Sequence, residues 1–406
     1  MPLASRRRFW IVGLLLAAVG ASIAWRGGGE SPDRLFDRAR TELAAGHPER
    51  AAAAIERLAA RRPPTGFDRL LHAQIDEALS RPIDALDELA RIPADDPVAP
   101  VARMVAGRLE MQRGRVGAAE AQYLACLAIQ PDAVKARREL VYIYSVQHRQ
   151  ADLDRQLHEL SERDSLEFAY LDHWGKTRNV VWSPERDCDE LSRFIEADPD
   201  DRRSRIALVE GLRRMHRLDE AEKVIEPLPA TDPEALALRG WLLLDRGELD
   251  ALDRFLADSP QDDPRLAKLR GNLALKRGDG PTAVRFFRIA QAAEPADRSL
   301  NSGLANALRL AGQLEAAAPY LEAVRLHDAI TPLITRASTD EGEKDRALPD
   351  QLAAACEAAG RLFEARAWYK LALSRDPVDA EAQQGFHRLG LRLAEARPPK
   401  DGEGAK

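Results

Sequence analysis

Residues 352–377, LAAACEAAGRLFEARAWYKLALSRDP, decide the fold, because they read as two short amphipathic helices joined by a turn at Gly360. Apolar residues recur at helical spacing on each side of the turn, and Pro377 closes the unit. Three small residues let the two helix backbones approach closely: Ala353, Ala365 and Ala372. Tyr369 is placed to fill the remaining space between them. The stretch therefore predicts a helical hairpin.

The same pattern recurs along most of the chain. If Ala365 is position 20 of a repeat, the equivalent upstream positions are 51, 85, 119, 153, 187, 221, 252, 283 and 317, of which the first six are 34 residues apart. Position 24 is apolar in every repeat: Ile55, Leu89, Tyr123, Leu157, Leu191, Ile225, Leu256, Phe287, Leu321 and Tyr369. Position 32 is proline in every repeat except two, which have Ser165 and Ala329. This register predicts an array of repeats rather than separate globular domains.

The register resembles the tetratricopeptide repeat (TPR), whose 34-residue consensus has small residues at positions 8, 20 and 27, a large apolar residue at 24 and proline at 32. The resemblance implies an all-α fold, a right-handed α-solenoid (superhelix) of about ten TPR helix pairs, over about residues 32–397. The expected repeats are residues 32–65, 66–99, 100–133, 134–167, 168–201, 202–232, 233–263, 264–297, 298–331 and 346–379.

Three departures from the regular register are expected. Repeats 202–232 and 233–263 are three residues short, and we expect the loss in the connector before the next helix. The extra residues 332–345 are polar in composition and predict a solvated loop. After the last repeat, residues 379–394 predict a capping helix that covers the open end of the array, and residues 398–406 predict a disordered tail.

An N-terminal membrane segment is expected before the array. Residues 1–8 are basic and predict a cytoplasmic segment, whereas residues 9–25 form an uncharged run with tryptophans near both ends. Such a run spans about 25 Å as a helix, which is the short limit for crossing a bilayer. Residues 26–31 predict a Gly-rich linker. The resulting protein would be single-pass, with a cytoplasmic N-terminus and an extracytoplasmic TPR array, periplasmic in a bacterium.

A cleaved signal peptide is the alternative to a retained anchor. Ser22 and Ala24 supply small residues before a cleavage site, and the apolar run is short for an anchor. Cleavage would leave a soluble secreted or periplasmic protein.

The composition argues against several other classes of protein. The 406 residues are 31% charged and only 5% aromatic, which suits thin packing of helix on helix better than a sandwich or an α/β sheet. The formal charge is −6 and no basic stripe is visible, so nucleic acid is not expected as a ligand.

The sequence offers no constellation for catalysis or metal binding. Residues 175–177, Gly-Lys-Thr, look like the end of a phosphate-binding loop, but Tyr170 stands where that motif needs glycine. The histidines lack HxxxH spacing, and no CxxC pair occurs among the three cysteines Cys126, Cys188 and Cys356. We therefore expect a protein that is not an enzyme and has no cofactor, no metal and no small-molecule substrate.

Because no catalytic or metal-binding motif is found, we look for function on the surface of the repeat array. In the TPR family the first helix of each repeat lines the concave groove, and the resemblance places five residues there as a candidate peptide-binding groove: Arg213, Trp241, Lys268, Asn272 and Asn306. Lys268 and Asn272 resemble half of the clamp with which some TPR domains hold a peptide carboxylate, although Gly303 replaces the asparagine of the next repeat. These side chains are expected to hold an extended acidic segment of a protein partner.

The sequence therefore predicts a membrane-tethered, non-catalytic scaffold for protein–protein interaction or complex assembly outside the cytoplasm. The alternatives are a soluble exported chaperone or assembly factor, and a helper subunit of a cofactor-assembly system. The resemblance itself names no partner.

Overall fold

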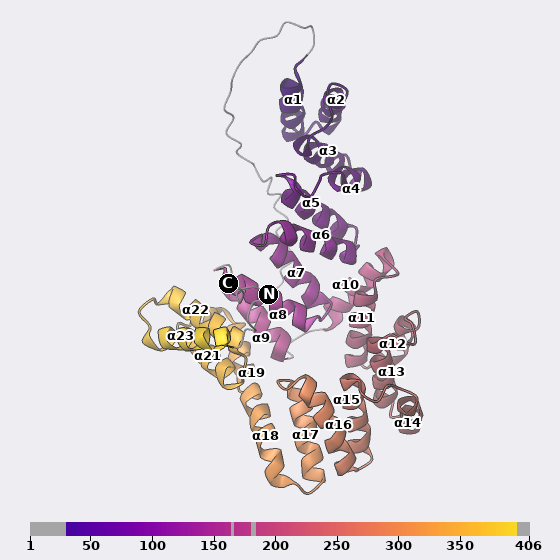
Figure 1. The fold of residues 1–406 in the computed structure, drawn as a ribbon, viewed down its shortest axis with the longest axis vertical. Helices are drawn as coiled ribbons and strands as arrows, with labels where there is room; N and C mark the ends of the chain where they lie inside the picture. The colour runs from indigo at the N-terminus through magenta and orange to yellow at the C-terminus, as the bar shows by residue number, and fades with distance from the viewer. Residues whose placement is uncertain (1–29, 164–165, 180–183, 396–406) are drawn as a thin grey trace, which may run out of the picture. The chain divides into compact units, whose positions relative to one another are not determined.

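The computed structural model describes residues 30–163, 166–179 and 184–395, and all regular structure in these ranges is α-helical (Figure 1). The prediction of an all-α fold is confirmed. The chain divides into two compact units, one ending at Arg81 and one beginning at Pro82, and each is described by itself.

The first unit contains three helices, α1 (Pro32–Ala44), α2 (Pro48–Ala59) and α3 (Gly66–Ala78). Both α1 and α3 begin at hydroxyl N-caps, Ser31 and Thr65, as the sequence pattern favours. A small apolar core joins the three helices and is formed by Leu35, Ala39, Ala51, Ala54, Ile55, Leu58, Leu71 and Ile75.

The second unit contains the remaining helices of the described chain. Its first helices are α4 (Pro82–Ala90), α5 (Ala99–Gln112), α6 (Val116–Ile129), α7 (Val134–Val146), α8 (Gln150–Glu162), α9 (Phe168–Asn179) and α10 (Pro184–Ala197). The middle helices are α11 (Arg202–Arg214), α12 (Leu218–Ile225), α13 (Pro233–Asp245), α14 (Leu249–Ala257), α15 (Pro264–Lys276) and α16 (Gly280–Ala293). The last are α17 (Arg298–Leu310), α18 (Leu314–Asp328), α19 (Ile330–Ala337), α20 (Asp340–Lys344), α21 (Leu348–Ala358), α22 (Leu362–Arg375) and α23 (Ala380–Glu395).

Helical hairpins form where a small residue of the first helix meets a large residue of the second. In α5–α6 a Cβ atom on Gly107 would lie 2.5 Å from Tyr123 Cε1, and in α15–α16 one on Gly271 would lie 2.9 Å from Phe287 Cδ2. Aspartates cap the first helices of successive repeats, since Asp201, Asp232, Asp263 and Asp297 accept hydrogen bonds from the free N–H groups of α11, α13, α15 and α17. Each such cap stabilises its helix by about 1 kcal/mol.

The two short repeats lose their residues in the second helix and not, as the sequence suggested, in a trimmed connector. Both α12 and α14 end early, at Ile225 and Ala257. Arginines from the next first helix then bind the released C-terminal carbonyls. Arg239 donates to the carbonyls of Ile225 and Leu228, and the buried Arg270 donates to those of Leu256, Ser259 and Pro260. In each short repeat, an arginine of the next helix therefore makes the hydrogen bonds to these carbonyls that a further helical turn would have made.

The fifth repeat does not form a closed hairpin of its own. Its second helix, α10, packs against α11 and α7, whereas its first helix, α9, packs against α8, α19 and α22. Position 8 of this repeat is Gly175, which contacts Ile334 of α19 at the place where a position-24 side chain normally fits. Helix α19 thus acts as the second helix for α9.

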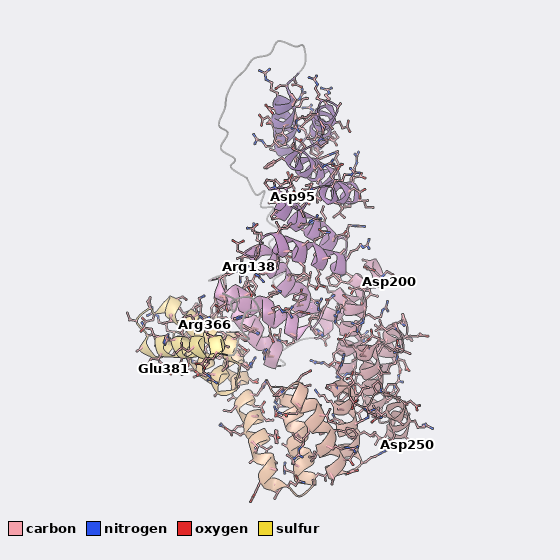
Figure 2. All side chains as sticks on the ribbon, in the orientation of Figure 1. Asp95, Arg138, Asp200, Asp250, Arg366 and Glu381 are labelled. Atoms are coloured by element: carbon pink, nitrogen blue, oxygen red, sulfur yellow. The ribbon has the colours of Figure 1, made fainter. Side chains whose placement is uncertain are left out.

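Polar and aromatic contacts tie the C-terminal hairpin to α8 and α9. Arg366, which is labelled in Figure 2, lies on α22 and forms an ion pair with Glu162 of α8. Lys370 Nζ donates to the Ser161 carbonyl oxygen at 2.5 Å. Phe168 and Trp368 meet edge to face with ring centroids 5.9 Å apart. The C-terminal repeat therefore returns to the middle of the unit.

One sequence prediction about this region needs correction. Residues 332–345 were expected as a solvated loop, but they hold the end of α19 and all of α20. The reason is apolar burial, since Ile330, Ile334 and Ala337 of α19 are almost completely buried. Helix α23, by contrast, lies where the capping helix 379–394 was expected, and its Gly385 contacts Tyr369.

The predicted single-pass membrane localisation is also corrected. Across residues 30–163, 166–179 and 184–395, no helix is both long enough and apolar enough to span a bilayer. The segments assigned to residues 1–8 and 9–25, most of the linker 26–31 and the tail 398–406 lie outside the described residues.

Candidate functional site

The predicted groove residues lie on four first helices that pack side by side in chain order. Helix α13 contacts α11 and α15, and α15 contacts α17 (Figure 1). Arg213 is on α11, Trp241 on α13, Lys268 and Asn272 on α15, and Asn306 on α17. The repeat architecture thus puts all five residues on one layer of helices.

Arg213 and Trp241 form one local group. The Arg213 guanidinium carbon lies 5.2 Å from the centre of the Trp241 ring. The same guanidinium pairs with Glu210 at 3.0 Å and with Asp245 at 2.8 Å. Burial lowers the pKa of Arg213, but its hydrogen bonds to the two carboxylates outweigh burial and raise it. The Arg213 guanidinium is therefore charged and held in place beside the indole ring by its two ion pairs.

Lys268 and Asn272 form a second group, one helical turn apart on α15. Lys268 Nζ lies 3.4 Å from Asp297 Oδ2, and Asn272 Nδ2 donates to the Lys268 carbonyl oxygen at 2.8 Å. Burial raises the pKa of Asp297, but the charge of Lys268 and the hydrogen bonds from Ser299, the Leu300 N–H and Lys268 together outweigh burial and lower it. Asn306 is exposed on α17.

The cationic side chains of this layer are largely paired with carboxylates of the same chain. Arg213 faces two carboxylates and Lys268 faces one, so neither is an unopposed cation. The same holds at the N-terminal ends of the helices, where Glu234 lies 3.6 Å from Arg203 and 3.8 Å from Arg265. An acidic segment would have to displace these internal carboxylates, so the expected preference for an acidic partner loses its electrostatic basis.

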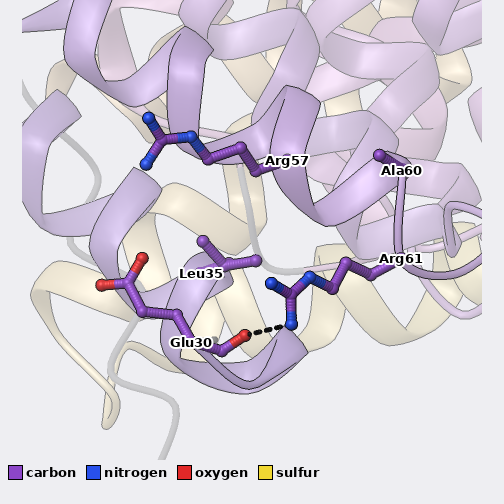
Figure 3. Close-up of a pocket in the computed structure, with 5 residues that line it drawn as sticks. All are labelled: Glu30, Leu35, Arg57, Ala60 and Arg61. Atoms are coloured by element: carbon purple, nitrogen blue, oxygen red, sulfur yellow. Dashed lines mark hydrogen bonds between the residues drawn. The ribbon is translucent and has the colours of Figure 1, made fainter. Parts of the chain in front are cut away.

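A surface pocket lies in the first unit, away from these helices in sequence. It has a volume of about 510 Å³ and is lined by Glu30, Leu35, Arg57, Ala60 and Arg61 (Figure 3). Arg61 Nη1 donates to the Glu30 carbonyl oxygen at 3.0 Å, and Glu30 pairs with Arg38. Sequence reasoning did not anticipate this pocket.

A serine–histidine contact in the second unit does not have the polarity of a catalytic pair. Ser145 Oγ lies 2.6 Å from His173 Nε2 and also donates to the Val141 carbonyl oxygen at 2.6 Å. The Ser145 hydroxyl donates to a backbone carbonyl in this arrangement, whereas general-base activation would require it to donate to the imidazole. Across the described ranges, no group of three or more His, Cys, Asp or Glu side chains is arranged to hold a metal ion.

Comparisons with known proteins agree with the repeat. Residues 268–330 match the model of the tetratricopeptide repeat family, and no curated protein matches the chain. Among solved structures, a tetratricopeptide repeat protein from Parabacteroides merdae is 13% identical, with 69% of this chain and 100% of that chain covered and a TM-score of 0.32. The C-terminal part of a TPR repeat-containing protein from Cytophaga hutchinsonii is 10% identical, with 66% and 99% covered and a TM-score of 0.31. The human IFIT1 dimer with m7Gppp-AAAA is 14% identical, with 90% and 82% covered and a TM-score of 0.36.

These TM-scores are low, so the structures add no argument about function. The TPR assignment rests on the family match within α15–α19 and on the helix pairs themselves.

Proposed function

We propose that the chain is a non-catalytic TPR scaffold that binds a segment of a protein partner along the layer formed by α11, α13, α15 and α17. The observation that supports this most directly is the grouping of a flat aromatic ring, an ordered guanidinium and two amides on these adjacent first helices. A repeat array grows by stacking and needs no ligand for its core, so such a polar layer is available for binding.

Amides and an aromatic face are suited to an extended backbone. Asn272 and Asn306 offer both donors and acceptors to peptide groups, and Trp241 offers a flat surface to a side chain. Because the cations are already paired, we expect binding to depend only modestly on salt.

The test is capture of partners by the full chain and by the double variant Lys268→Ala/Asn272→Ala. We expect the double variant to lose about ten-fold in capture of a specific partner while its thermal midpoint changes little. The matched control is Arg288→Ala/Gln291→Ala, which removes one cation and one amide from α16, a second helix, and should leave capture unchanged. Equal capture by both double variants, with both folded, would refute binding at this layer.

A further inference from the structure

One second helix keeps an uncovered apolar face. Position 24 is 3% exposed or less in nine repeats, where it packs under the next helix. In the ninth repeat the residue is Leu321 of α18, and it is 44% exposed. Leu314, two turns earlier on α18, is 66% exposed, and Leu310 at the end of α17 is 49% exposed. Leu314 and Leu321 thus remain open to water at positions where the repeat register places an interface, and the nearby Leu310 is exposed as well.

The preceding repeat shows what normally covers this face. On α16, Gly280 and Phe287 stand at the positions of Leu314 and Leu321, and both are buried, as is Val284 between them. Helix α17 covers them, with Gly303 so close to the Phe287 ring that a Cβ atom there would lie 2.5 Å from Cε1. On α17 the buried leucines are spaced four residues apart: Leu300, Leu304 and Leu308.

No helix of the chain's own C-terminal repeat is free to cover α18. In a continued array that helix would be α21, with Leu348, Leu352 and Cys356 at the positions that Leu300, Leu304 and Leu308 occupy on α17. All three are completely buried. Helix α21 packs against α19 and α22 and also contacts α18, but Leu314 and Leu321 remain exposed. The return of the C-terminal repeat to α9 thus leaves the face of α18 only partly covered.

We propose that the outer face of α18, defined by Leu314 and Leu321, binds one amphipathic helix of a protein partner as α16 binds α17. The partner helix would carry apolar residues four apart along one stripe and a small residue between the first two, as α17 does. The argument is continuity of the stacking interface, since each earlier second helix in this register is covered in that way. This surface is separate from the polar layer of the proposed function.

A second copy of the chain is a poorer occupant, because its own first helix has a polar face. On α1 the residues equivalent to Leu300, Leu304 and Leu308 are Arg34, Arg38 and Glu42. Placing these charged groups on Leu314 and Leu321 would cost their desolvation without an ion-pair partner on the α18 stripe.

The test uses the full chain and a fluorescent synthetic peptide of residues 297–312, which is α17 with its Asp297 cap. We expect saturable binding by fluorescence anisotropy, and at least a ten-fold loss with Leu321→Glu or Leu314→Glu. The matched control is Leu124→Glu on α6, because Leu124 is 43% exposed but stands at position 25, outside the stacking face. A peptide carrying Leu304→Glu should not bind.

The other occupants give distinct outcomes. Absence of saturable binding, or equal binding by Leu321→Glu and Leu124→Glu, overturns the proposal. A dimer of the free chain that dissociates on Leu321→Glu, seen by sedimentation, assigns the face to a second copy and also overturns it. So does a monomer in which the Leu321→Cys thiol reacts with maleimide much more slowly than the Leu124→Cys thiol, because the chain then covers its own face.

Discussion

Gly175 of α9 lies against Ile334 of α19 so closely that any side chain at position 175 would collide with the Ile334 Cδ1 atom. This contact joins the fifth repeat to a helix that follows the ninth. It also explains why a glycine that looked like part of a phosphate-binding loop stands in the middle of a helix.

Substituting Gly175 tests the packing of α9 on α19. Gly175→Ala should destabilise the second unit by about 1–3 kcal/mol, because the methyl group overpacks a buried contact. Ile334→Ala should cost less stability in the Gly175→Ala background than in the wild type, because it relieves this overpacking, so the double-mutant cycle should show a coupling of about 1 kcal/mol or more. Denaturant unfolding of the four proteins measures both quantities.

The control for this cycle is Gly117→Ala on α6, where nothing lies within 4 Å of an added Cβ atom. That change should stabilise the chain by up to about 1 kcal/mol, since alanine is the better helix former. Additive effects at positions 175 and 334 would show that α9 and α19 do not touch.

Truncating the side chain at position 24 should lower the free energy of unfolding by very different amounts in different repeats. Leu157→Ala and Tyr369→Ala remove side chains that are 0% and 2% exposed, so each should cost about 2–5 kcal/mol of unfolding free energy. Leu321→Ala, at the same position 24, should cost under about 1 kcal/mol because Leu321 is already half in water. A large loss at Leu321 in the isolated chain would contradict its exposure.

Arg270 should contribute more to the stability of the fold than Arg277, which forms ion pairs at the surface. Arg270→Met leaves three backbone carbonyls at the end of α14 without their donor, and should cost about 2–3 kcal/mol. Arg277→Met removes exposed ion pairs with Asp250 and Asp253 and should cost under about 1 kcal/mol. Thermal unfolding of the two variants gives the comparison, and the reverse order would refute the carbonyl-binding role.

The stability of the C-terminal repeat should fall as pH rises through the mildly acidic range. Burial, together with the charges of Asp379 and Glu381, raises the pKa of Asp350 to about 6 from an ordinary 3.8. Below the unfolded value both states are protonated and the stability is fully present. Between pH 4 and 6 the unfolded chain releases the proton more readily, so stability is lost as the pH rises through the folded value.

Asp350→Asn removes this dependence. Relative to the wild type, the variant should gain about 1–2 kcal/mol between pH 4 and pH 7, measured by denaturant unfolding at both values. Asp376→Asn, in the connector before α23, serves as the nearby control. A constant difference between Asp350→Asn and wild type across this range would show that Asp350 ionises normally.

Local features of this fold were predictable because their causes are local. The residues at positions 8 and 24 marked the hairpins, as Gly107–Tyr123 and Gly271–Phe287 confirm. The acid before a proline marked the helix starts, and Asp232 and Asp263 are indeed N-caps. Which first helices would carry the groove residues also followed from the register.

Long-range features were not predictable from the register, because they depend on which surfaces meet. The pairing of α9 with α19, and that of Arg213 with Asp245, each join residues of different repeats. One signal was present but missed. Ile330, Ile334 and Ala337 have helical apolar spacing that runs into the stretch 332–345 read as a loop, and Ala329 replaces the proline that normally ends a repeat.

The pairing of Gly175 with Ile334 also sets an order of events during synthesis. Ile334 leaves the ribosome about 160 residues after Gly175, which at about 5–20 residues per second is about 8–30 s later. Over that interval α10 is present and α19 is not, so we expect the nascent α9 to pair first with the neighbour that its own repeat supplies. Synthesis of α19 then supplies a competing helix, so the final partner of α9 is made about 160 residues after α9 itself.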